Sequence, residues 1–451
     1  MFERLRHTRT PVRSRLTSRA WLVGVAIVGA SATSAHATVA QTTGRATVVE
    51  DSTRVALADL DATFLRRNLA VIAARFNVDA TAAAIEQARL WPNPNISTEQ
   101  MVNAGGRPPF DFTRTGNTDI SLSQLIVLAG KRSKQVQLAA INRDVAQYQV
   151  ADLLRALRFE LRSDFFSLYY LQRAVTFDDR IITSLGGTIA AAERMYESRS
   201  LLLSELVRLR ALLLTVQAER LSLQSQIRDF EGSLRILLHD DRASTTLYVP
   251  TLDPARLDSL HVDTVSVANA VAVARSSRPD VRIAAAGVDY ETTNLALQRA
   301  LRTPDVTLAG HYSRNGSFLP DYFGLGVAID LPVFNRNQGN INVSRATLQG
   351  NRQLAAAAAE RAERDVLTAY QKAVDADQLY RALDRRFLSE YDRLVEGTSR
   401  MYVQRDITII QFTDFFDSYR QTMQQLSQLA TTRVTAFEAL NFAAGRAMVT
   451  P

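Results

Sequence analysis

The chain of 451 residues contains no cysteine and only five histidines. Without cysteine the protein forms no disulfide, offers no thiolate to a metal ion and cannot be acylated at a leading cysteine as a lipoprotein. Beyond residue 40 the histidines reduce to His239, His261 and His311, and no two of them have the spacing of a shared metal site. Stability must therefore come from burial and association.

Sequence patterns of catalysis are also missing. The chain has no Gly-x-Ser-x-Gly elbow, no Gly-rich phosphate loop and no cysteine nucleophile. We therefore expect a protein that is not an enzyme, with no catalytic residues, no cofactor and no resident metal site.

Proline is absent from two long intervals, between Pro109 and Pro250 and between Pro332 and Pro451. Because proline breaks helix interiors, both intervals can form very long helices. Apolar residues step by three and four along them, as at Leu154, Leu157 and Leu161. A helix over about 133–196 would be roughly 90 Å long. Its apolar stripe must pack on other long helices. A soluble coiled-coil scaffold is one class of protein in which long helices pack in this way, and it remains an alternative.

The chain has only one marked apolar run near its N-terminus, and that run is short. Six arginines accompany the segment 21–30 (WLVGVAIVGA), and small residues follow it. This pattern is typical of a signal peptide over 1–40, cleaved after Ala37 or Ala40, whereas a membrane anchor needs a longer apolar core. The leader carries +5 of the formal net charge of +7. The mature chain therefore has +2, and the basic pI does not indicate nucleic-acid binding.

Four short segments have the periodicity of strands: about 95–102, 118–128, 304–313 and 322–332. Such segments, apolar on one face and small or polar on the other, are typical of outer-membrane barrels, although an amphipathic hairpin on a soluble core has a similar pattern. Four strands cannot close a barrel around a water-filled lumen, and lipid does not tolerate open edges. Strands that enter a membrane must therefore be pooled from several chains.

The sequence also repeats itself. Residues 195–199 (MYESR) recur 206 positions later as 401–405 (MYVQR), and 125–128 (LIVL) recur at the same offset as 331–334 (LPVF). A third pair, 94–97 (PNIS) and 304–307 (PDVT), is offset by 210. Three pairs of similar segments in the same order indicate two copies of one supersecondary unit.

The repeats and the periodicity together predict a mainly α fold with a small β part and two internal repeats. We expect a signal peptide at 1–40, a first repeat at 41–240, an inter-repeat crossing at 241–265 and a second repeat at 266–451. Each repeat should hold a helix of about 57–90 or 265–302, two strands and a long helical hairpin. The hairpins should turn near 198–201 and 405–407.

These motifs together resemble the TolC-like outer-membrane efflux proteins, nearest the heavy-metal (Czc/Cus-type) branch. The resemblance spans essentially the whole mature chain. Its motifs are WPNP at 91–94, QLIVLAGKR at 124–132, RPD at 278–280, PD at 304–305, LPVFNRNQG at 331–339 and YVQRDITIIQF at 402–412, which leads to DFF at 414–416.

The resemblance implies a homotrimeric channel. Each protomer would give four strands to a shared 12-stranded outer-membrane β-barrel and long helices to a periplasmic α-barrel. The strand–helix junctions would lie at the periplasmic edge of the barrel: Gly130, Lys131, Arg132, Asn335, Arg336, Asn337, Gln338 and Gly339.

The resemblance also implies that the hairpin tips contact a periplasmic adaptor. The matching positions are Arg199, Ser200, Leu201, Arg405, Asp406 and Ile407. Many relatives have glycine where this chain has Arg199 and Arg405. In relatives, acidic rings just above the tips narrow the pore, at positions that match Gln411 and Asp414. Gln411 is uncharged, but Asp414, helped by Asp417, would still form a three-fold ring that attracts cations.

The expected function is an outer-membrane exit channel of a tripartite efflux pump. The channel would be a passive duct for substrates, metal cations first among them, supplied by an inner-membrane RND-type transporter and a periplasmic adaptor. Most of its mass would lie in the periplasm, its barrel would contact outer-membrane lipid, and it would bind no nucleic acid. The alternatives are a TolC-type duct for multidrug efflux or type I protein secretion, and a soluble periplasmic coiled-coil scaffold.

Overall fold

The computed structural model describes residues 52–100, 118–241, 247–314, 319, 321–383 and 385–449. The expected signal peptide lies outside this part of the chain, as do residues 101–102 of the first expected strand. Residues Glu50–Pro451 form one compact unit.

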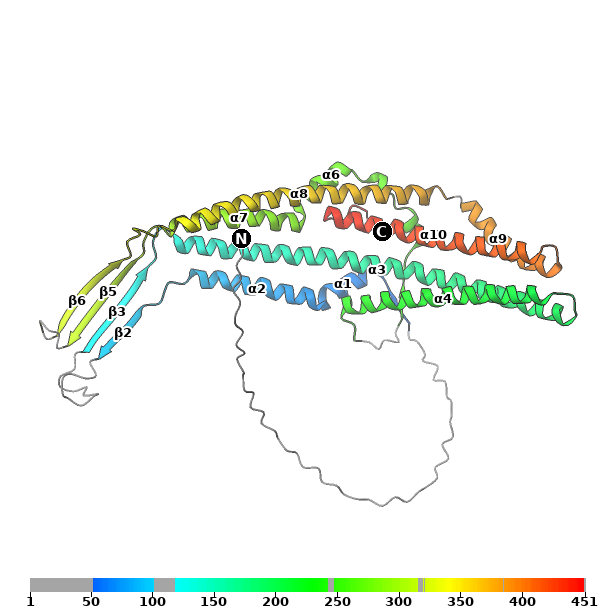
Figure 1. The fold of residues 1–451 in the computed structure, drawn as a ribbon, viewed down its shortest axis with the longest axis horizontal. Helices are drawn as coiled ribbons and strands as arrows, with labels where there is room; N and C mark the ends of the chain where they lie inside the picture. The colour runs from blue at the N-terminus through cyan, green and yellow to red at the C-terminus, as the bar shows by residue number, and fades with distance from the viewer. Residues whose placement is uncertain are drawn as a thin grey trace, which may run out of the picture. The chain divides into compact units, whose positions relative to one another are not determined.

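The described residues are mainly helical, as predicted, and Figure 1 labels the elements. In chain order the elements are β1 (Ser52–Val55), α1 (Leu57–Arg67), α2 (Leu69–Arg89), β2 (Asn95–Gln100), β3 (Thr118–Ile126), α3 (Lys131–Glu197), α4 (Leu203–Leu238), β4 (Leu247–Pro250), α5 (Pro254–Asp258), the 3₁₀-helix η1 (Val262–Thr264), α6 (Val267–Ser277), α7 (Pro279–Ala300), β5 (Val306–Arg314), β6 (Tyr322–Ile329), α8 (Gln338–Arg381), α9 (Arg385–Gln404) and α10 (Ile409–Ala444).

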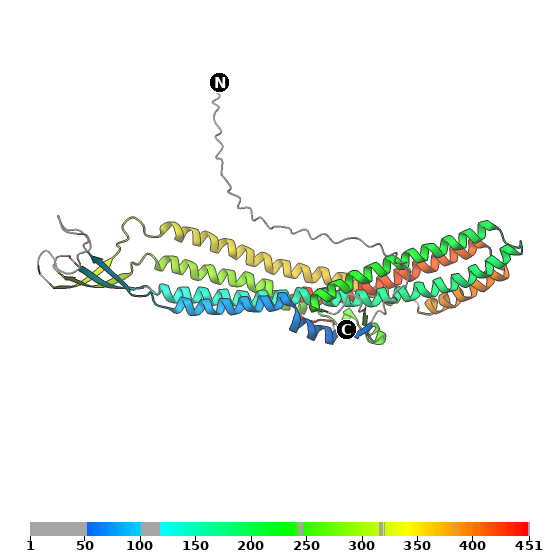
Figure 2. The same ribbon diagram turned by 90° about the horizontal axis from the view of Figure 1, so that it is seen from below.

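Helix α3 is a continuous helix of 67 residues, close to the 133–196 expected from the proline-free interval. At about 1.5 Å per residue it is ~100 Å long. It begins just after β3 and ends at the first hairpin turn, so it separates the sheet from the tips by that distance. Figure 2 shows α3 between the strands and the tips, with α4 and α10 beside its far half.

Two helices that the sequence suggests as continuous are each broken in the structure. Asn68 interrupts the expected 57–90 helix, because its Oδ1 accepts the Val71 N–H at 3.0 Å and so caps α2. The Asn68 side chain also donates to the Leu237 carbonyl at 2.9 Å. Pro279 begins α7 at the other break, in the first turn where proline is tolerated.

Four strands form one antiparallel sheet in the order β2-β3-β5-β6. Its strands end at Gln100, Ile126, Arg314 and Ile329, slightly different from the expected limits. The helices follow the same order, since α2 packs on α3, α3 on α7, and α7 on α8. The four strands and the four helices therefore lie side by side in the same spatial order: β2-β3-β5-β6 and α2-α3-α7-α8.

The inter-repeat crossing is more ordered than a surface loop. Its β4 pairs in parallel with β1, and Leu257 and Val262 are buried against α8 and α10. The guanidinium of Arg433, which is 1% exposed, donates to the carbonyls of Leu257 and Leu260 and to Asp377. These hydrogen bonds satisfy buried carbonyl groups and so hold the crossing against α10. The contact joins residues far apart in the sequence, so local turn propensity does not predict it.

Candidate functional site

Both helical hairpins turn through the same backbone motif. Arg199 and Arg405 have φ of 58° and 66°, the left-handed conformation that glycine adopts most easily. The Ser200 N–H donates to the Met195 carbonyl, and the Asp406 N–H donates to the Met401 carbonyl, each at 2.8 Å. These bonds close a Schellman-type helix end in each half. Arginine therefore adopts the left-handed turn geometry in both hairpins.

The tip residues expected to meet a partner divide into two groups. Arg199, Ser200, Arg405 and Asp406 are exposed, whereas Leu201 is buried and Ile407 is partly buried in the core below the tips. Sequence reasoning did not single out Leu202 and Leu203, which are 67% and 55% exposed at the first tip. Their only sequence signal is the run of three leucines at the turn.

An aromatic cluster joins the two hairpins beneath the tips. Tyr402, Phe412 and Phe416 stack with ring centroids 4.9 and 4.5 Å apart. The Tyr402 hydroxyl donates to Glu205 Oε2 on α4 at 3.2 Å. Burial, followed by the nearby Glu205 carboxylate, raises the pKa of Tyr402 to about 12, so its hydroxyl stays protonated and can donate. This contact links the two repeats, and sequence reasoning did not find it.

The three expected gate residues differ in their environment. Gln411 completes a capping box, since its Oε1 accepts the Thr408 N–H at 2.9 Å and its own N–H donates to the Thr408 hydroxyl at 3.2 Å. Asp414 is exposed. Asp417 lies 3.4 Å from Arg420, and burial together with the Asp414 charge raises its pKa. The capping role explains glutamine at 411 without any role in a gate.

A layer of charged groups lies next to these residues, between α3, α4 and α10. Arg420 pairs with Glu219 of α4 and with Asp417. Asp178 of α3 is 1% exposed, and its Oδ2 has no hydrogen-bond partner among the described residues. Burial, and then the neighbouring Asp179 carboxylate, raises the pKa of Asp178 to about 6, although Arg420 and Arg220 favour its ionised form. Nothing in the local sequence marks Asp178 as buried.

The first strand–helix junction ties the two repeats together. Gly130 has φ of 65°, and the following Lys131 is buried with its Nζ 2.7 Å from Asp305, just before β5. Partial burial opposes ionisation of Asp305, but hydrogen bonds from Lys131 and from the Leu128 N–H prevail and lower its pKa. Arg132 lies 3.9 Å above the Trp91 ring. The junction is thus a specific contact between the halves.

The second junction has an asparagine as its left-handed residue. Asn337 has φ of 57° and precedes α8, whereas Gly339 lies inside the helix. The Asn337 side chain donates to the Gln298 carbonyl at 2.8 Å, which fixes the start of α8 against the end of α7. Arg336 donates its N–H to Gln338 Oε1 at 2.8 Å, and Asn335 accepts from the Asn337 N–H at 3.0 Å. Asparagine suits this position because its short polar side chain tolerates the left-handed region.

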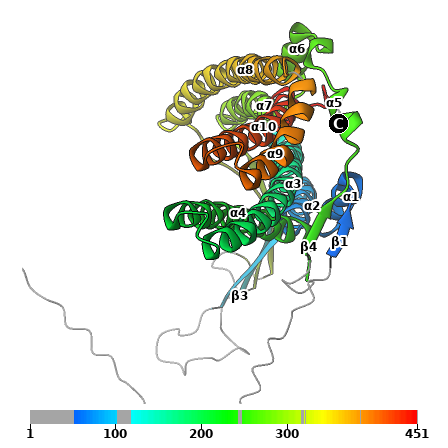
Figure 3. The ribbon, with the colours of Figure 1, turned by 90° about the vertical axis from the view of Figure 1, so that its right-hand side faces the viewer.

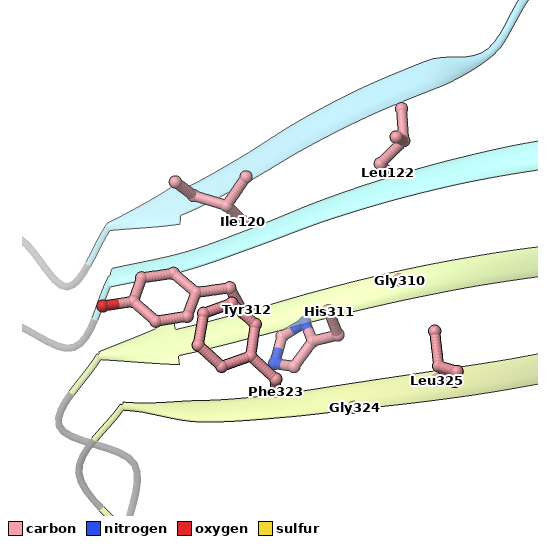
Figure 4. Close-up of a pocket in the computed structure, with 8 residues that line it drawn as sticks. All are labelled: Ile120, Leu122, Gly310, His311, Tyr312, Phe323, Gly324 and Leu325. Carbon is pink, nitrogen blue, oxygen red and sulfur yellow. The ribbon is translucent and has the colours of Figure 1, made fainter.

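The sheet has two chemically different faces. One face is apolar and exposed, with Ile96, Ile120, Leu122, Leu308, Tyr312, Phe323, Leu325, Val327 and Ile329. A hollow of about 500 Å³ lies on it, and its lining residues come from β3, β5 and β6 (Figure 4). Gly310 is the ladder partner of both Leu122 and Leu325, and a Cβ added to it would meet nothing within 4 Å.

The opposite face of the sheet is mostly polar or small, with Leu125 and Tyr322 as its large side chains. Its residues include Ser97, Glu99, Asp119, Ser121, His311, Ser313, Gly324 and Gly326. No helix among the described residues is long and apolar enough to cross a membrane. In the same part of the chain, no three histidine or acidic side chains converge as a metal site.

Comparison with known proteins gives a consistent family. Residues 270–446 match the family described as outer membrane efflux protein. The cobalt-zinc-cadmium resistance protein CzcC of Cupriavidus metallidurans is 24% identical over 279 residues, which cover 61% of this chain and 62% of CzcC. The alignment therefore spans less than two thirds of that relative.

Solved structures share the fold at low sequence identity. CusC is 16% identical with a TM-score of 0.71, over 86% of this chain and 92% of that one. The CmeC outer membrane channel of Campylobacter jejuni is 13% identical with a TM-score of 0.72, over 86% and 85%. The outer membrane protein VceC of Vibrio cholerae is 17% identical with a TM-score of 0.67, over 87% and 96%.

Proposed function

The predicted resemblance to the TolC-like outer-membrane efflux proteins is confirmed, and from that premise we propose that this protein is an outer-membrane exit channel of a tripartite efflux pump. The observation that carries the proposal is a two-faced, four-stranded sheet with unpaired edges, joined to a layer of helices of which α3 is about 100 Å long. The apolar face suits lipid and the polar face suits a water-filled lumen.

Both edge strands of the sheet have backbone groups that further copies of the chain would pair. Among the described strands, β2 and β6 each pair on one side only. Exposed backbone groups at such edges are not tolerated in lipid. Three copies would supply twelve strands and close a barrel, with β2 of one protomer beside β6 of the next.

The helices carry matching apolar edges. On α4, Leu203, Val207, Leu214 and Leu221 are 53–67% exposed and lie within about 40° of one another at 100° per residue. On α8, Val343, Leu354 and Leu379 are 58–65% exposed and fall within about 20°. Figure 3 shows α4 and α8 on opposite sides of α3 and α10. These stripes support side-by-side contact between protomers in a homotrimer.

A narrow pore at the tips would be lined by Asp414. Three copies of its exposed carboxylate form a ring that attracts cations, and Asp417 beside it adds negative charge. Planar-bilayer recordings test this role. We expect Asp414→Ala to weaken block by divalent cations about tenfold. Gln411→Glu should keep the capping bonds to Thr408 and strengthen the block, because it adds a carboxylate next to the ring. Unchanged block in Asp414→Ala would remove this residue from the gate.

Metal cations are the proposed substrates, supported by the similarity to CzcC. Drugs or secreted proteins are the alternative cargo, since the CmeC outer membrane channel and the outer membrane protein VceC also have this fold. Growth of a deletion strain on cobalt, zinc, cadmium, copper and bile salts separates these classes. Sensitivity to bile salts alone would reject metal export.

The proposed partners are a periplasmic adaptor at the exposed tips and an inner-membrane RND-type transporter. The proposed location is the outer membrane, reached by export through the signal peptide expected at residues 1–40, with the helices in the periplasm. A soluble periplasmic scaffold is the competing function, and cell fractionation decides between them. Recovery as a soluble monomer would contradict the channel.

A further inference from the structure

The polar face of the sheet holds one histidine–carboxylate pair. His311 on β5 and Asp119 on β3 come from adjacent antiparallel strands, and His311 Nε2 lies 3.3 Å from Asp119 Oδ1. Both side chains are partly exposed, at 42% and 25%. They are thus within contact distance of each other and open to the solvent on the face that the channel would turn to its lumen.

The spacing of these two atoms fits a shared metal ion. Zinc binds histidine nitrogen and carboxylate oxygen at about 2.0–2.2 Å in a tetrahedral arrangement. Two ligand atoms of such an ion stand ~3.4 Å apart, by the tetrahedral angle and those bond lengths. The observed separation of 3.3 Å therefore allows one divalent ion to bind both atoms without movement of either strand.

The surroundings favour a cation. Glu99 is the ladder partner of Asp119 on β2, so its carboxylate is on the same face, with Cβ atoms about 4.5–5.5 Å apart for such pairs. Ser121 and Ser313 are the ladder partners of His311 and Asp119 and place hydroxyl groups beside the pair. On β6, the partner of His311 is Gly324, and the ring of Tyr322 occupies the space into which a Cβ on Gly324 would point.

We propose that His311 and Asp119 form a weak binding site for divalent transition-metal ions such as Zn²⁺, with water completing the coordination. Two protein ligands hold an ion loosely, which suits an ion in passage better than a resident cofactor. The site rests on the proposed function for its place in a lumen. In a trimer it would occur three times.

The position of the site along the strands gives it a role at the exit. Asp119 is the second residue of β3 and Ser313 is the last but one of β5. Both lie at the strand ends far from α3 and α8, and so on the external side of the proposed barrel. Ions leaving the channel would pass these carboxylates and imidazoles near the outer ends of the described strands.

Equilibrium dialysis of the purified full-length protein against Zn²⁺ tests the site directly, without any transport assay. We expect one saturable Zn²⁺ per chain, and at least tenfold weaker binding in both His311→Gln and Asp119→Asn. His261→Gln is the matched control, since it removes a histidine in the inter-repeat crossing. Circular dichroism and size-exclusion chromatography verify that each variant keeps its fold.

Three outcomes would overturn the site: no saturable zinc binding by the wild type, equal binding by His311→Gln, or an equal loss in His261→Gln. Conductance of the wild-type protein in planar bilayers is a separate readout for the channel itself. A conducting wild type with unchanged zinc binding in His311→Gln would reject the metal site and leave the channel standing. A wild type that binds zinc through His311 but does not conduct would reject the channel and leave the metal site standing.

Discussion

Asp178 is a buried carboxylate in the middle of a helical layer, and its neighbours do not fully satisfy it. The Asp178 side chain is 1% exposed. Two arginines act on its charge, but Arg420 already pairs with Glu219 and Arg220 already pairs with Asp179. Burial prevails over these cations, so the pKa of Asp178 rises from 3.8 to about 6. Because the folded state binds the proton more tightly than the unfolded chain, stability falls as the pH rises from about 4 to 6 and stays lower above that range.

Asp178→Asn should therefore stabilise the protein at pH 7.5. We expect a gain of roughly 1–3 kcal/mol, since one pKa unit corresponds to about 1.4 kcal/mol, and a flatter stability profile between pH 4.5 and 7. Thermal unfolding in detergent at several pH values measures both. Asp229→Asn is the control, because Asp229 on α4 is exposed and is not among the groups that shift the pKa of Asp178. An equal gain in that control would show that the effect is not due to burial.

Tyr402 is one of the residues that link the two hairpins. Tyr402→Phe keeps the ring stacking with Phe412 but removes the hydrogen bond to Glu205. We expect a loss of about 1–2 kcal/mol and a higher open probability of the pore, since the bond to a charged group holds the tips together. Thermal unfolding and single-channel recording measure the two effects.

Tyr196 provides the control for that change. It stands 206 positions earlier in the first repeat and is 40% exposed. Tyr196→Phe should leave both stability and gating nearly unchanged. Similar effects in the two variants would argue that the Tyr402 contact has no special part in closing the tips.

At the scale of elements, each hairpin end depends on one left-handed residue. The two turns share their hydrogen bonds at the same offset of 206 positions as the repeated sequence motif. The junctions at the opposite helix ends do not share one residue type: Gly130 has the left-handed conformation in one half, and Asn337 has it in the other. Backbone conformation is thus repeated where the residue type is not.

Replacing the two left-handed arginines by glycine should strengthen the tips. Arg199→Gly and Arg405→Gly remove a steric cost of about 1–2 kcal/mol, so we expect a net gain of about 1 kcal/mol for each after the entropy of glycine is included. Chemical denaturation measures the change. Arg194→Gly, in the last turns of α3, should instead destabilise by about 1 kcal/mol. A loss of stability in the two tip variants would contradict the left-handed geometry.

At the scale of the whole molecule, the unpaired features are at its two sides. One side has β2 and the apolar stripe of α4, and the other has β6 and the stripe of α8. A single chain leaves both sides in contact with solvent. The proposed trimer would bury them together, so folding of the barrel and assembly of the helical layer become one process.

A charge on the α4 stripe should prevent assembly. We expect Leu214→Asp to shift the protein from trimer to monomer, because an unpaired carboxylate would be buried between protomers. Light scattering after size-exclusion chromatography in detergent measures the mass. Thr215→Asp is the control, since residue 215 is exposed but turned about 100° away from the stripe. A trimer in Leu214→Asp would exclude α4 from the interface.

The sequence by itself determined the elements whose causes are local. Proline-free intervals with a three-and-four apolar spacing predicted α3, period-two alternation predicted the four strands, and the MYESR and MYVQR motifs predicted the two turns. The mainly helical fold and the family resemblance are confirmed. The roles of the gate, tip and junction residues remain proposals.

Only the tertiary structure decided which distant groups meet. The pairs Lys131–Asp305, Tyr402–Glu205 and His311–Asp119 join residues more than 170 positions apart. The burial of Asp178 and the anchoring of the crossing by Arg433 likewise depend on how long helices lie side by side. Helix and strand periodicity fixes which face of an element is apolar, but register between elements is set by packing over the whole chain, and these contacts depend on that register.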